Sequence, residues 1–287
     1  MAAATVAFQV EIVRHSISQC TLAATIDMVK SEYSPDPTPG ARPIGVSDPA
    51  AAAANIQQMF NSIAPTYDRA NHLLSAGIDR LWWRRTARTL RPILARPEAV
   101  VLDLCCGTGD LTLALDKHRP QPATGTLQPA TLLAVDFSRN MLALAQPKFA
   151  GRNIRAIEGD ALHLPFADSS IDLAACAFGF RNLASYPDGL VELYRVLRPA
   201  GQIAILDFNQ PTGLVGALYS LYFKHLLPRL GRLISRDPAA YTYLPESVAR
   251  FPRPSRMIEL IAATGFINPT WTPYTFGVAG LYRATKA

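Results

Sequence analysis

The segment VLDLCCGTGD at 101–110 constrains the fold more than any other part of the chain, because a buried strand runs directly into a glycine turn. The apolar residues between 100 and 104 form the near-continuous run that is typical of a parallel strand covered on both faces. Gly107 and Gly109 let the backbone turn sharply into a helix that begins near Leu111. A nucleotide-like ligand can therefore approach this backbone closely.

The spacing of these glycines counts against a dinucleotide site, because the dinucleotide fingerprint needs a third glycine where this chain has Thr112. The next apolar run, TLLAVD at 131–136, ends in Asp136. An acid at the tip of the neighbouring strand can accept hydrogen bonds from both ribose hydroxyls of an adenosine. With EGDALHLPF at 158–166 as a third element, the three segments together indicate one ligand site.

The chain has 287 residues, 49% of them hydrophobic, which is enough for one large α/β domain with a substantial core and an additional tail. No stretch approaches about 18 uncharged apolar residues, so no membrane span is predicted. The amino terminus carries Glu11, Arg14 and His15 within its apolar stretch and lacks the pattern of a signal peptide. We therefore expect a cytoplasmic protein.

The net charge of +6 comes from basic residues that are dispersed and not interleaved with aromatics, so we expect no nucleic-acid partner. Attraction to an anionic membrane surface explains the charge equally well. The four cysteines have neither disulfide nor metal-ligand spacing, and no metal is expected. Cys105 and Cys106 are interpreted as small buried side chains beside the turn.

Residues 1–49 are expected to form a disordered or loosely ordered tail, because prolines punctuate a stretch without a sustained period. A short helix near 7–30 is the only element expected there. Residues 50–287 form the predicted domain. Within it, 119–130 reads as a soft surface insertion, and 210–250 as a helical excursion that covers the substrate.

Strand and helix patterns alternate through the domain, which predicts a parallel sheet with helices on both faces. The predicted helices begin at caps such as Asp79, Ser138 and Ser185. They span 50–60, 79–91, 110–118, 138–149, 185–197 and 254–264. The predicted strands span 99–104, 131–136, 153–158, 171–177, 202–208, 266–274 and 277–285.

Ligands bind at the carboxyl ends of the strands in open α/β sheets. Five segments that are far apart in the chain fall at such ends, so we expect them to meet in one crevice. They are Asp103–Gly109, Asp136, Asp160, Ala177–Asn182 and Asp207–Gln210.

The motifs resemble those of the class I S-adenosylmethionine-dependent methyltransferases, and more closely those of their ubiquinone/menaquinone-biosynthesis C-methyltransferase family. The resemblance covers about 55–287 and implies a Rossmann-like, mostly parallel seven-stranded sheet with helices on both faces. It is carried by FNSIAPTYDRANHLLSAGIDRLWW at 60–83, VLDLCCGTGDLT at 101–112, GDALHLPF at 159–166, FGFRN at 178–182, LDFNQP at 206–211 and FPRPSRM at 251–257.

The resemblance implies S-adenosylmethionine as the cofactor and gives roles to the glycine turn. Gly107, Thr108 and Gly109 would hold the methionyl part through backbone and hydroxyl contacts. Asp103, just upstream, would orient the ammonium group. Tyr67 would close over the cofactor, with a packing role as the alternative.

The resemblance also implies contacts to the nucleoside. Asp136 would bind the ribose. The Asp160 carboxylate and the Ala161 N–H would read the adenine edge. Ala177 stands where the family usually has serine, so a hydroxyl contact to the cofactor is missing there.

Methyl transfer from a sulfonium is an in-line displacement, so the protein must align a nucleophilic carbon behind the methyl group and exclude water. Arg181 stays protonated, so it can stabilise a phenolate or bias a bound water; a structural salt bridge is the alternative. Asn182 would hold the second ring oxygen. His72 and His163 are candidate bases, although a lone histidine is more often structural.

GLVGALYSLYFKHLLPRLGRLI at 213–234 alternates apolar turns with basic residues and is too short and too charged to span a membrane. Such a helix can lie at a bilayer interface or cover a tunnel for a prenyl chain, and an ordinary lid helix is the alternative. The expected partners are a lipid-tailed quinol and the inner face of the membrane. A homodimer is left open.

The resemblance predicts C-methylation of a polyprenylated quinol, with demethylmenaquinol as the expected substrate. The 2-polyprenyl-6-methoxy-1,4-benzoquinol of ubiquinone biosynthesis is the near alternative. A catalytically silent scaffold in a quinone-synthesis complex is disfavoured by the intact GTGD and FGFRN segments. An oxidoreductase is disfavoured by Thr112.

Overall fold

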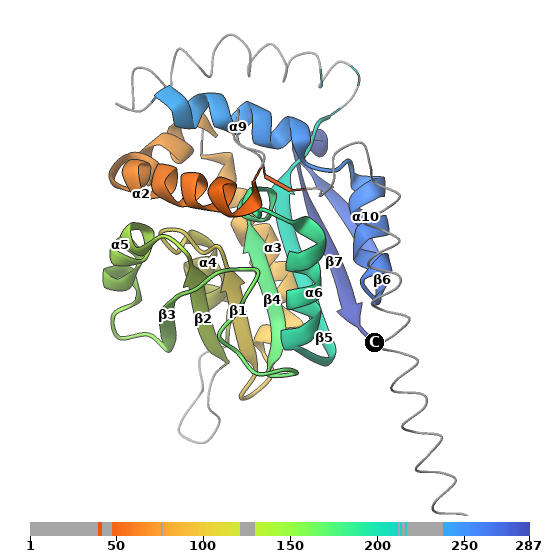
Figure 1. Cartoon of the computed structure of the whole chain (residues 1–287). Helices are drawn as coiled ribbons and strands as arrows, with labels where there is room; N and C mark the ends of the chain where they lie inside the picture. Colours follow the sequence, from red (N-terminus) through yellow and green to blue (C-terminus); the bar gives the residue numbers. More distant parts are fainter. Residues whose placement is uncertain are drawn as a thin grey trace, which may run out of the picture.

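The computed structural model describes residues 40–41, 48–75, 77–120, 130–211, 213, 216 and 238–287. Seven strands in these ranges form one sheet in the order β3-β2-β1-β4-β5-β7-β6 (Figure 1). The first five pair in parallel, and β7 is antiparallel to both of its neighbours. The predicted mostly parallel, seven-stranded α/β sheet is confirmed. The strands are β1 Val100–Leu104, β2 Thr131–Asp136, β3 Ile154–Glu158, β4 Ile171–Ala177, β5 Leu197–Phe208, β6 Phe266–Tyr274 and β7 Ala279–Lys286.

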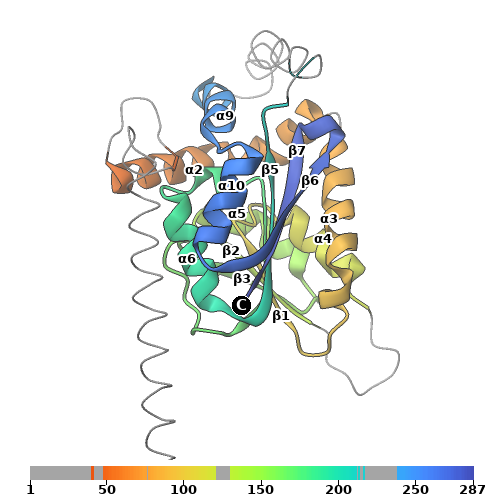
Figure 2. The same ribbon diagram turned by 90° about the vertical axis from the view of Figure 1, so that its right-hand side faces the viewer.

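Helices cover both faces of this sheet, with α3 and α4 on one face and α6 and α10 on the other (Figure 2). A further helix, α2, lies across the carboxyl ends of the strands (Figure 1). The helices are α2 Pro49–Leu74, α3 Ile78–Leu94, α4 Asp110–His118, α5 Arg139–Phe149, α6 Tyr186–Val196, α9 Pro238–Arg250 and α10 Pro254–Ala263. Short 3-10 turns, η1 at Phe180–Asn182 and η3 at Thr275–Gly277, follow β4 and β6.

Strand β1 shows why the central strands read as continuous apolar runs. Val101 belongs to the core that includes Leu90 of α3 and Leu115 of α4. Leu102 belongs to the core on the other face. Because successive side chains point to opposite faces and both faces are covered, every position of such a strand excludes water.

Helix α2 is much longer than the predicted 50–60. The expected end was wrong because the helix continues through Pro65, which lacks the N–H that would bond the carbonyl of Asn61. That carbonyl instead accepts a hydrogen bond from Asn140 Nδ2 at 3.0 Å. The Asn61 side chain also accepts from Ser138 Oγ at 2.6 Å. A tertiary contact thus replaces the bond that proline removes and fixes α2 to the start of α5.

The caps were predicted with mixed success. Ser138 and Ser185 accept from the backbone N–H groups of Met141 and Asp188, as expected. Asp79 is not a cap, because α3 begins after Gly77, which adopts a left-handed φ of 76°. The Asp79 carboxylate lies in the first turn and accepts from the N–H of Arg80 at 2.7 Å.

Strand β5 begins at Leu197, earlier than the predicted position 202, because a register shift between the pairs Ile171–Leu197 and Leu173–Gln202 extends its pairing with β4 back to Leu197. The tail up to 39 and most of 119–130 and 213–237 lie outside the described residues. The predictions for these segments, including lipid contact by 213–234, stay predictions. No helix in the described ranges is long and apolar enough to cross a membrane.

A buried charge network lies at the amino end of β2, at the opposite end of the strands from the glycine turn. Arg119 and Asp116 are 6% and 3% exposed and form an ion pair at the end of α4. The Arg119 guanidinium also donates to the carbonyl of Ala130, and Arg152 lies 2.5 Å from the second oxygen of Asp116. One carboxylate thus compensates a buried guanidinium and ties α4 to β2 and to the end of α5.

We predict that Asp116→Ala destabilises the fold by about 3–5 kcal/mol, because it leaves the Arg119 guanidinium buried without its counter-charge. Asp168→Ala is the matched control: it removes an ion pair to Arg195 whose carboxylate is 77% exposed. Exposed pairs contribute about 0–1 kcal/mol. Urea unfolding monitored by circular dichroism compares the two variants, and equal losses of stability would contradict the prediction.

Candidate active site

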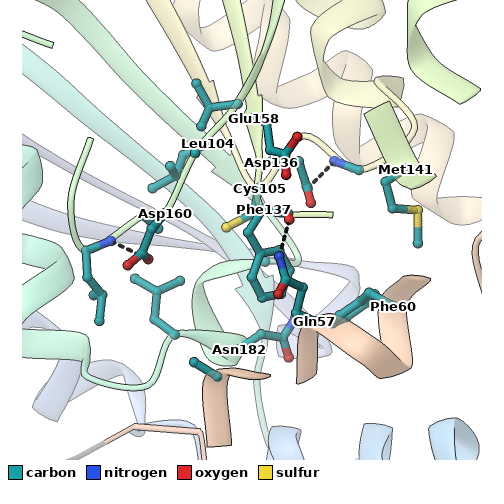
Figure 3. A pocket seen from close by; sticks show the side chains of 18 of the residues that line it. Gln57, Phe60, Leu104, Cys105, Asp136, Phe137, Met141, Glu158, Asp160 and Asn182 are labelled. Atoms are coloured by element: carbon teal, nitrogen blue, oxygen red, sulfur yellow. Dashed lines mark hydrogen bonds between the residues drawn. The ribbon is translucent and has the colours of Figure 1, made fainter. Parts of the chain in front are cut away.

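The segments that the sequence placed at strand ends do meet, and they surround two adjoining cavities at the carboxyl ends of β1 to β5. The first cavity has a volume of about 500 Å³. Asp136 and Asp160 line it (Figure 3), and so do Ala161, Ala177 and Gly107. The five residues come from four strands, β1 to β4, and the loops that follow them, so the structure brings this group together as expected.

The charged side chains among the described lining of the first cavity are all acidic. Its lining contains the carboxylates of Asp136, Glu158 and Asp160. No lysine or arginine is among the described residues that line it. A pyrophosphate group would meet negative side chains here and no described positive one to compensate its charge. The cavity therefore suits a nucleoside ligand that carries no phosphate and has positive charge of its own.

Asp136 is the most deeply placed of these acids, at 5% exposure. Its two oxygens accept from the backbone N–H groups of Gly107 and Ser138, each at 2.8 Å. Burial raises the pKa of Asp136 to about 6, although these hydrogen bonds oppose the rise. Each carboxylate oxygen has a second lone pair, so both can accept from a diol in the cavity.

The glycine turn divides its roles differently from the prediction. Gly107 lines both cavities and has a φ of 54°. Gly109 lines neither cavity; it is the residue before α4, with a φ of 90°, and a Cβ there would lie 2.5 Å from the ring of Phe149. Gly109 is therefore required for the backbone turn and for packing against α5.

Thr108 lines the second cavity, but its hydroxyl donates to Asp68 Oδ1 at 2.5 Å. The other oxygen of Asp68 lies 2.8 Å from Lys148 Nζ. The turn, α2 and α5 are thereby linked through one carboxylate. This link was missed in the sequence, since α2 was expected to end before Asp68.

The Asp160 carboxylate accepts from the N–H of Leu162 at 3.0 Å and lies 2.9 Å from His163 Nδ1. That neighbour raises the pKa of His163, which is 84% exposed at its side chain. His163 lines neither cavity. The structure thus places Asp160 and Ala161 at the site, and His163 beside it as the partner of Asp160.

Helix α2 forms the wall opposite the strand ends. Gln57 and Phe60 reach into the first cavity from α2, facing Asp136 and Glu158 across it (Figure 3). Gln57 donates to the carbonyl of Phe137 at 2.6 Å. The spacing of Ala53, Gln57, Phe60 and Tyr67 is that of one helix face, and this periodicity was the signal that could have revealed these residues.

The second cavity, of about 270 Å³, lies beside the first, and its lining combines a cluster of aromatic rings with acidic and other polar side chains. Phe178 packs against Phe208 with ring centroids 4.6 Å apart and against Trp82 at 5.6 Å. Trp83 also lines this cavity, and Ile78 and Val278 contribute apolar side chains to it. This cavity suits a flat aromatic group with an apolar extension.

Five residues line both cavities, so the two ligands they would hold meet at a shared wall. They are Tyr67, Cys105, Gly107, Ala177 and Phe178. Burial raises the pKa of the Tyr67 hydroxyl, while Arg181 nearby opposes the rise. The Cys105 thiol is also protonated, because a hydrogen bond with Cys176 and burial raise its pKa. Neither group is a base at neutral pH.

Asp103 leaves a hydrogen-bonding deficit in the second cavity. It is 1% exposed, and its Oδ2 accepts from the Thr112 hydroxyl at 2.5 Å. Its Oδ1 is buried with no hydrogen-bond partner among the described residues. Burial raises the pKa of Asp103 to about 7. Such an oxygen needs a donor, and a ligand ammonium group supplies both the donor and the missing positive charge.

Arg181 forms the salt bridge that the sequence left as an alternative role. Its guanidinium lies 2.9 Å from Asp207 Oδ1 and also donates to the carbonyl of Phe178. Burial alone would lower the pKa of Arg181, but the field of Asp207 outweighs it and the pKa is raised. Arg181 also lines the second cavity, and its Nε has no partner among the described residues. The salt bridge between Arg181 and Asp207 is thus structural, and its arginine also borders the second cavity.

Asn182 follows Arg181 in the same 3-10 turn but lines the first cavity instead. Its Oδ1 accepts from the hydroxyl of Tyr243 on α9 at 3.1 Å. The two residues therefore line different cavities, whereas the expectation was that they hold one ring between them.

His72 is held by Asp79, with 2.7 Å between Nδ1 and Oδ2, and its ring packs edge-on against Trp83. Asp79 lines the second cavity, whereas His72 does not. The described residues contain no cluster of three or more metal-binding side chains.

The chain belongs to the ubiE/COQ5 methyltransferase family. The model of that family matches residues 49–286. The demethylmenaquinone methyltransferase of Deinococcus radiodurans is 45% identical over 80% of this chain and 92% of that protein. The enzyme of the same name from Thermus thermophilus is 45% identical over 78% of this chain and 98% of its own length.

Solved structures support the fold alone, because their sequences are distant. The [4+2]-cyclase SpnF has a TM-score of 0.59 at 13% identity and covers 87% of this chain and 98% of its own. An S-adenosylmethionine-dependent methyltransferase of Thermotoga maritima, described as a possible histamine N-methyltransferase, has a TM-score of 0.56 at 17% identity. The match covers 81% of this chain and 100% of that one.

We predict that S-adenosylmethionine affinity weakens as the pH falls below about 7, because protons on Asp103 compete with the ligand ammonium group. The slope approaches tenfold per pH unit and steepens below about pH 6, where Asp136 also takes up a proton. Affinity weakens again above about pH 8, where an α-amino group loses its proton. Calorimetry from pH 5.5 to 8.5 measures the profile.

Asp103→Asn is the control for this profile. This variant should bind S-adenosylmethionine weakly at pH 7.5, and its affinity should not change between pH 6 and 7. In the unliganded protein the raised pKa of Asp103 means that the folded state holds its proton more tightly than the unfolded state. Stability from this group therefore falls as the pH rises from about 4 to about 7. A flat affinity profile for the natural protein would contradict the role of Asp103.

Proposed function

We propose that this chain is an S-adenosylmethionine-dependent C-methyltransferase that converts demethylmenaquinol to menaquinol. The observation that carries the proposal is the buried Oδ1 of Asp103, which has no partner among the described residues and belongs to the second cavity, next to a first cavity with acidic but no basic side chains among its described lining. These carboxylates fit a nucleoside ligand that carries positively charged ammonium and sulfonium groups. The names of the relatives from Deinococcus radiodurans and Thermus thermophilus support the quinol as substrate.

The first cavity would hold the adenosine part of the cofactor, and the methionyl part would extend past Gly107 into the second cavity, which Asp103 lines. Asp136 would accept from the ribose hydroxyls, and Asp160 with the N–H of Ala161 would meet the adenine edge. Asp103 and the backbone at Gly107 would orient the methionyl part. When bound, the cofactor supplies an electrophilic methyl group for an in-line displacement.

The second cavity would hold the quinol ring. Phe178, Phe208 and Trp82 form an aromatic enclosure of suitable shape. Ala177 and Phe178 line both cavities, so a ring carbon in the second can face a methyl group in the first. The small side chain of Ala177 leaves this shared wall thin.

Arg181 would stabilise the phenolate of the quinol. Its charge is permanent, its pair with Asp207 fixes its position, and its Nε is unpartnered in the described structure. In a site lined by aromatic rings, such a donor acts on developing negative charge with little competition from water. We therefore propose that Arg181 combines the structural and the catalytic role.

The purified protein tests the activity directly. With S-adenosylmethionine and a short-tailed demethylmenaquinol kept reduced by dithionite, it should form the methylated quinol detected by mass spectrometry. Asp136→Ala should bind the cofactor about tenfold to a few hundredfold more weakly, since charged hydrogen bonds contribute roughly 1.5–3 kcal/mol each.

Several results would overturn the proposal. Faster turnover of the 2-polyprenyl-6-methoxy-1,4-benzoquinol than of the demethylmenaquinol would show that the substrate is the quinol of ubiquinone biosynthesis. Absence of methyl transfer to either quinol would support a silent scaffold. Nicotinamide dinucleotides should not compete with S-adenosylmethionine, and tight binding of such a dinucleotide would favour an oxidoreductase function instead.

For Arg181 we predict that the conservative Arg181→Lys variant stays folded and binds the cofactor normally, while its single-turnover rate falls about tenfold. An ammonium can keep the ion pair with Asp207 but cannot present the planar fork of a guanidinium to a second acceptor. Arg181→Ala should lose about 10²–10³ in rate. It should also melt at a lower temperature, because it leaves Asp207 buried without a counter-charge.

The lysine variant separates catalysis from folding. Single-turnover rates are measured at 10 °C beside thermal melts and cofactor titrations. A lysine variant that methylates at the natural rate would show that Arg181 is structural only. An alanine variant that melts early but reacts normally in the cold would show the same.

A further inference from the structure

Five large apolar side chains are exposed on the described surface: Ile78, Leu81, Leu144, Ile267 and Phe276. Phe276 is 84% exposed and Leu81 61%. Ile78 lines the second cavity, Leu81 precedes the lining residue Trp82, and Phe276 follows the lining residue Thr275. Three of the five exposed side chains therefore belong to the segments that form the second cavity.

The contact between α3 and η3 fixes this arrangement. Trp82, which follows Leu81, donates from Nε1 to the hydroxyl of Thr275 at 2.8 Å. The tip of the β6–β7 hairpin lies beside α3 in Figure 2. Both Thr275 and Phe276 have left-handed φ angles, of 44° and 55°, which are unfavourable for residues with a Cβ. The backbone is thus strained in the conformation that exposes the Phe276 ring to solvent.

Arginines accompany these apolar side chains. Exposed Arg80, Arg84, Arg88 and Arg91 recur every three or four residues along α3, which places them in one stripe. The stripe begins at the cavity mouth with Arg80 and Arg84. No ion pair to either of these two is found among the described residues. At about 1.5 Å per residue, Arg88 and Arg91 lie roughly 12 and 16 Å farther along the helix than Arg80.

We propose that Arg80, Leu81, Arg84 and Phe276, called here the docking rim, bind the surface of an anionic lipid bilayer and place the second cavity against it. The inference rests on the proposed function, because a lipid-tailed quinol must pass from a membrane into that cavity. Leu81 and Phe276 would insert at the boundary between headgroups and acyl chains. Arg80 and Arg84 would contact anionic headgroups.

The geometry favours a membrane over a protein partner, because the exposed apolar residues adjoin a cavity whose proposed substrate lies in lipid. Ile78 and Val278 continue the apolar surface from the rim into the cavity. A prenyl tail could therefore remain in lipid while the ring enters. Arg88 and Arg91 lie more than a Debye length from Arg80, so a bilayer at the mouth would attract them less.

Sedimentation with vesicles tests the docking rim. Vesicles contain 70% phosphatidylcholine and 30% phosphatidylglycerol, and phosphatidylcholine alone serves for comparison. The double variant Arg80→Gln with Arg84→Gln should lower the partition coefficient on anionic vesicles about 25-fold, since each basic residue contributes about fivefold. Leu81→Ser with Phe276→Ser should lower it at least about tenfold.

The chain offers matched controls for both changes. Arg88→Gln with Arg91→Gln removes the same charge from the same stripe, and Ile267→Ser removes an exposed apolar side chain at the far end of the hairpin. Both should change vesicle binding less than threefold. Turnover of long-chain demethylmenaquinol in vesicles should fall with the rim variants. Turnover of a short-tailed quinol in solution should not, since no residue of the rim lines either cavity.

The outcomes separate the two proposals. If the natural protein methylates neither quinol, the proposed function fails. If it methylates the soluble quinol but does not bind anionic vesicles, or if rim and control variants bind them equally, the docking rim is wrong. Dimers that dissociate when Leu81 and Phe276 are replaced, without vesicle binding by the natural protein, would identify the rim as a contact between copies.

Discussion

The structure depends on carboxylates that are buried at the carboxyl ends of the parallel strands with too few cations to compensate them. Asp207 is paired with Arg181, but Asp136 is held only by backbone N–H groups and Asp103 by one hydroxyl among the described residues. Burying such charges is costly, and the raised pKa values of Asp103 and Asp136 report that cost. A cationic ligand would remove the deficit, which supports the binding site proposed at the carboxyl ends of the strands.

The surrounding elements keep these acids in place and dry. Thr112 stands where a dinucleotide fold has glycine, and its hydroxyl donates a hydrogen bond to Asp103. Helix α2 covers the site and is fixed through Asn61 and Asp68 to the start of α5, to Lys148 and to the glycine turn. Pro65 therefore does not end α2, because tertiary bonds replace the one that it removes. The enclosed site favours interactions with developing charge that water would weaken.

Much of this could be predicted from the sequence where one local signal dominates. The apolar runs of β1, β2 and β4 gave their bounds almost to the residue, and Ser138 and Ser185 gave two helix starts. Predictions failed where a distant contact overrides a local rule, as at Pro65 and at the early start of β5. Site residues on strand ends could be found. Gln57 and Phe60 share one face of the predicted helix 50–60, a signal too weak by itself to show that this face covers a ligand site, and Asp68 lies beyond the expected end of that helix. Likewise, the sequence could not show that Arg181 and Asn182 face different cavities, because side-chain direction in a short turn depends on packing.

A crystal structure of the protein with S-adenosylhomocysteine tests the central claim most directly, since this compound carries the same ammonium, ribose and adenine groups. The account predicts the ammonium nitrogen within about 2.7–3.2 Å of Asp103 Oδ1, and both ribose hydroxyls on the carboxylate of Asp136. An ammonium group directed to solvent, with water bound to Asp103 Oδ1, would contradict it.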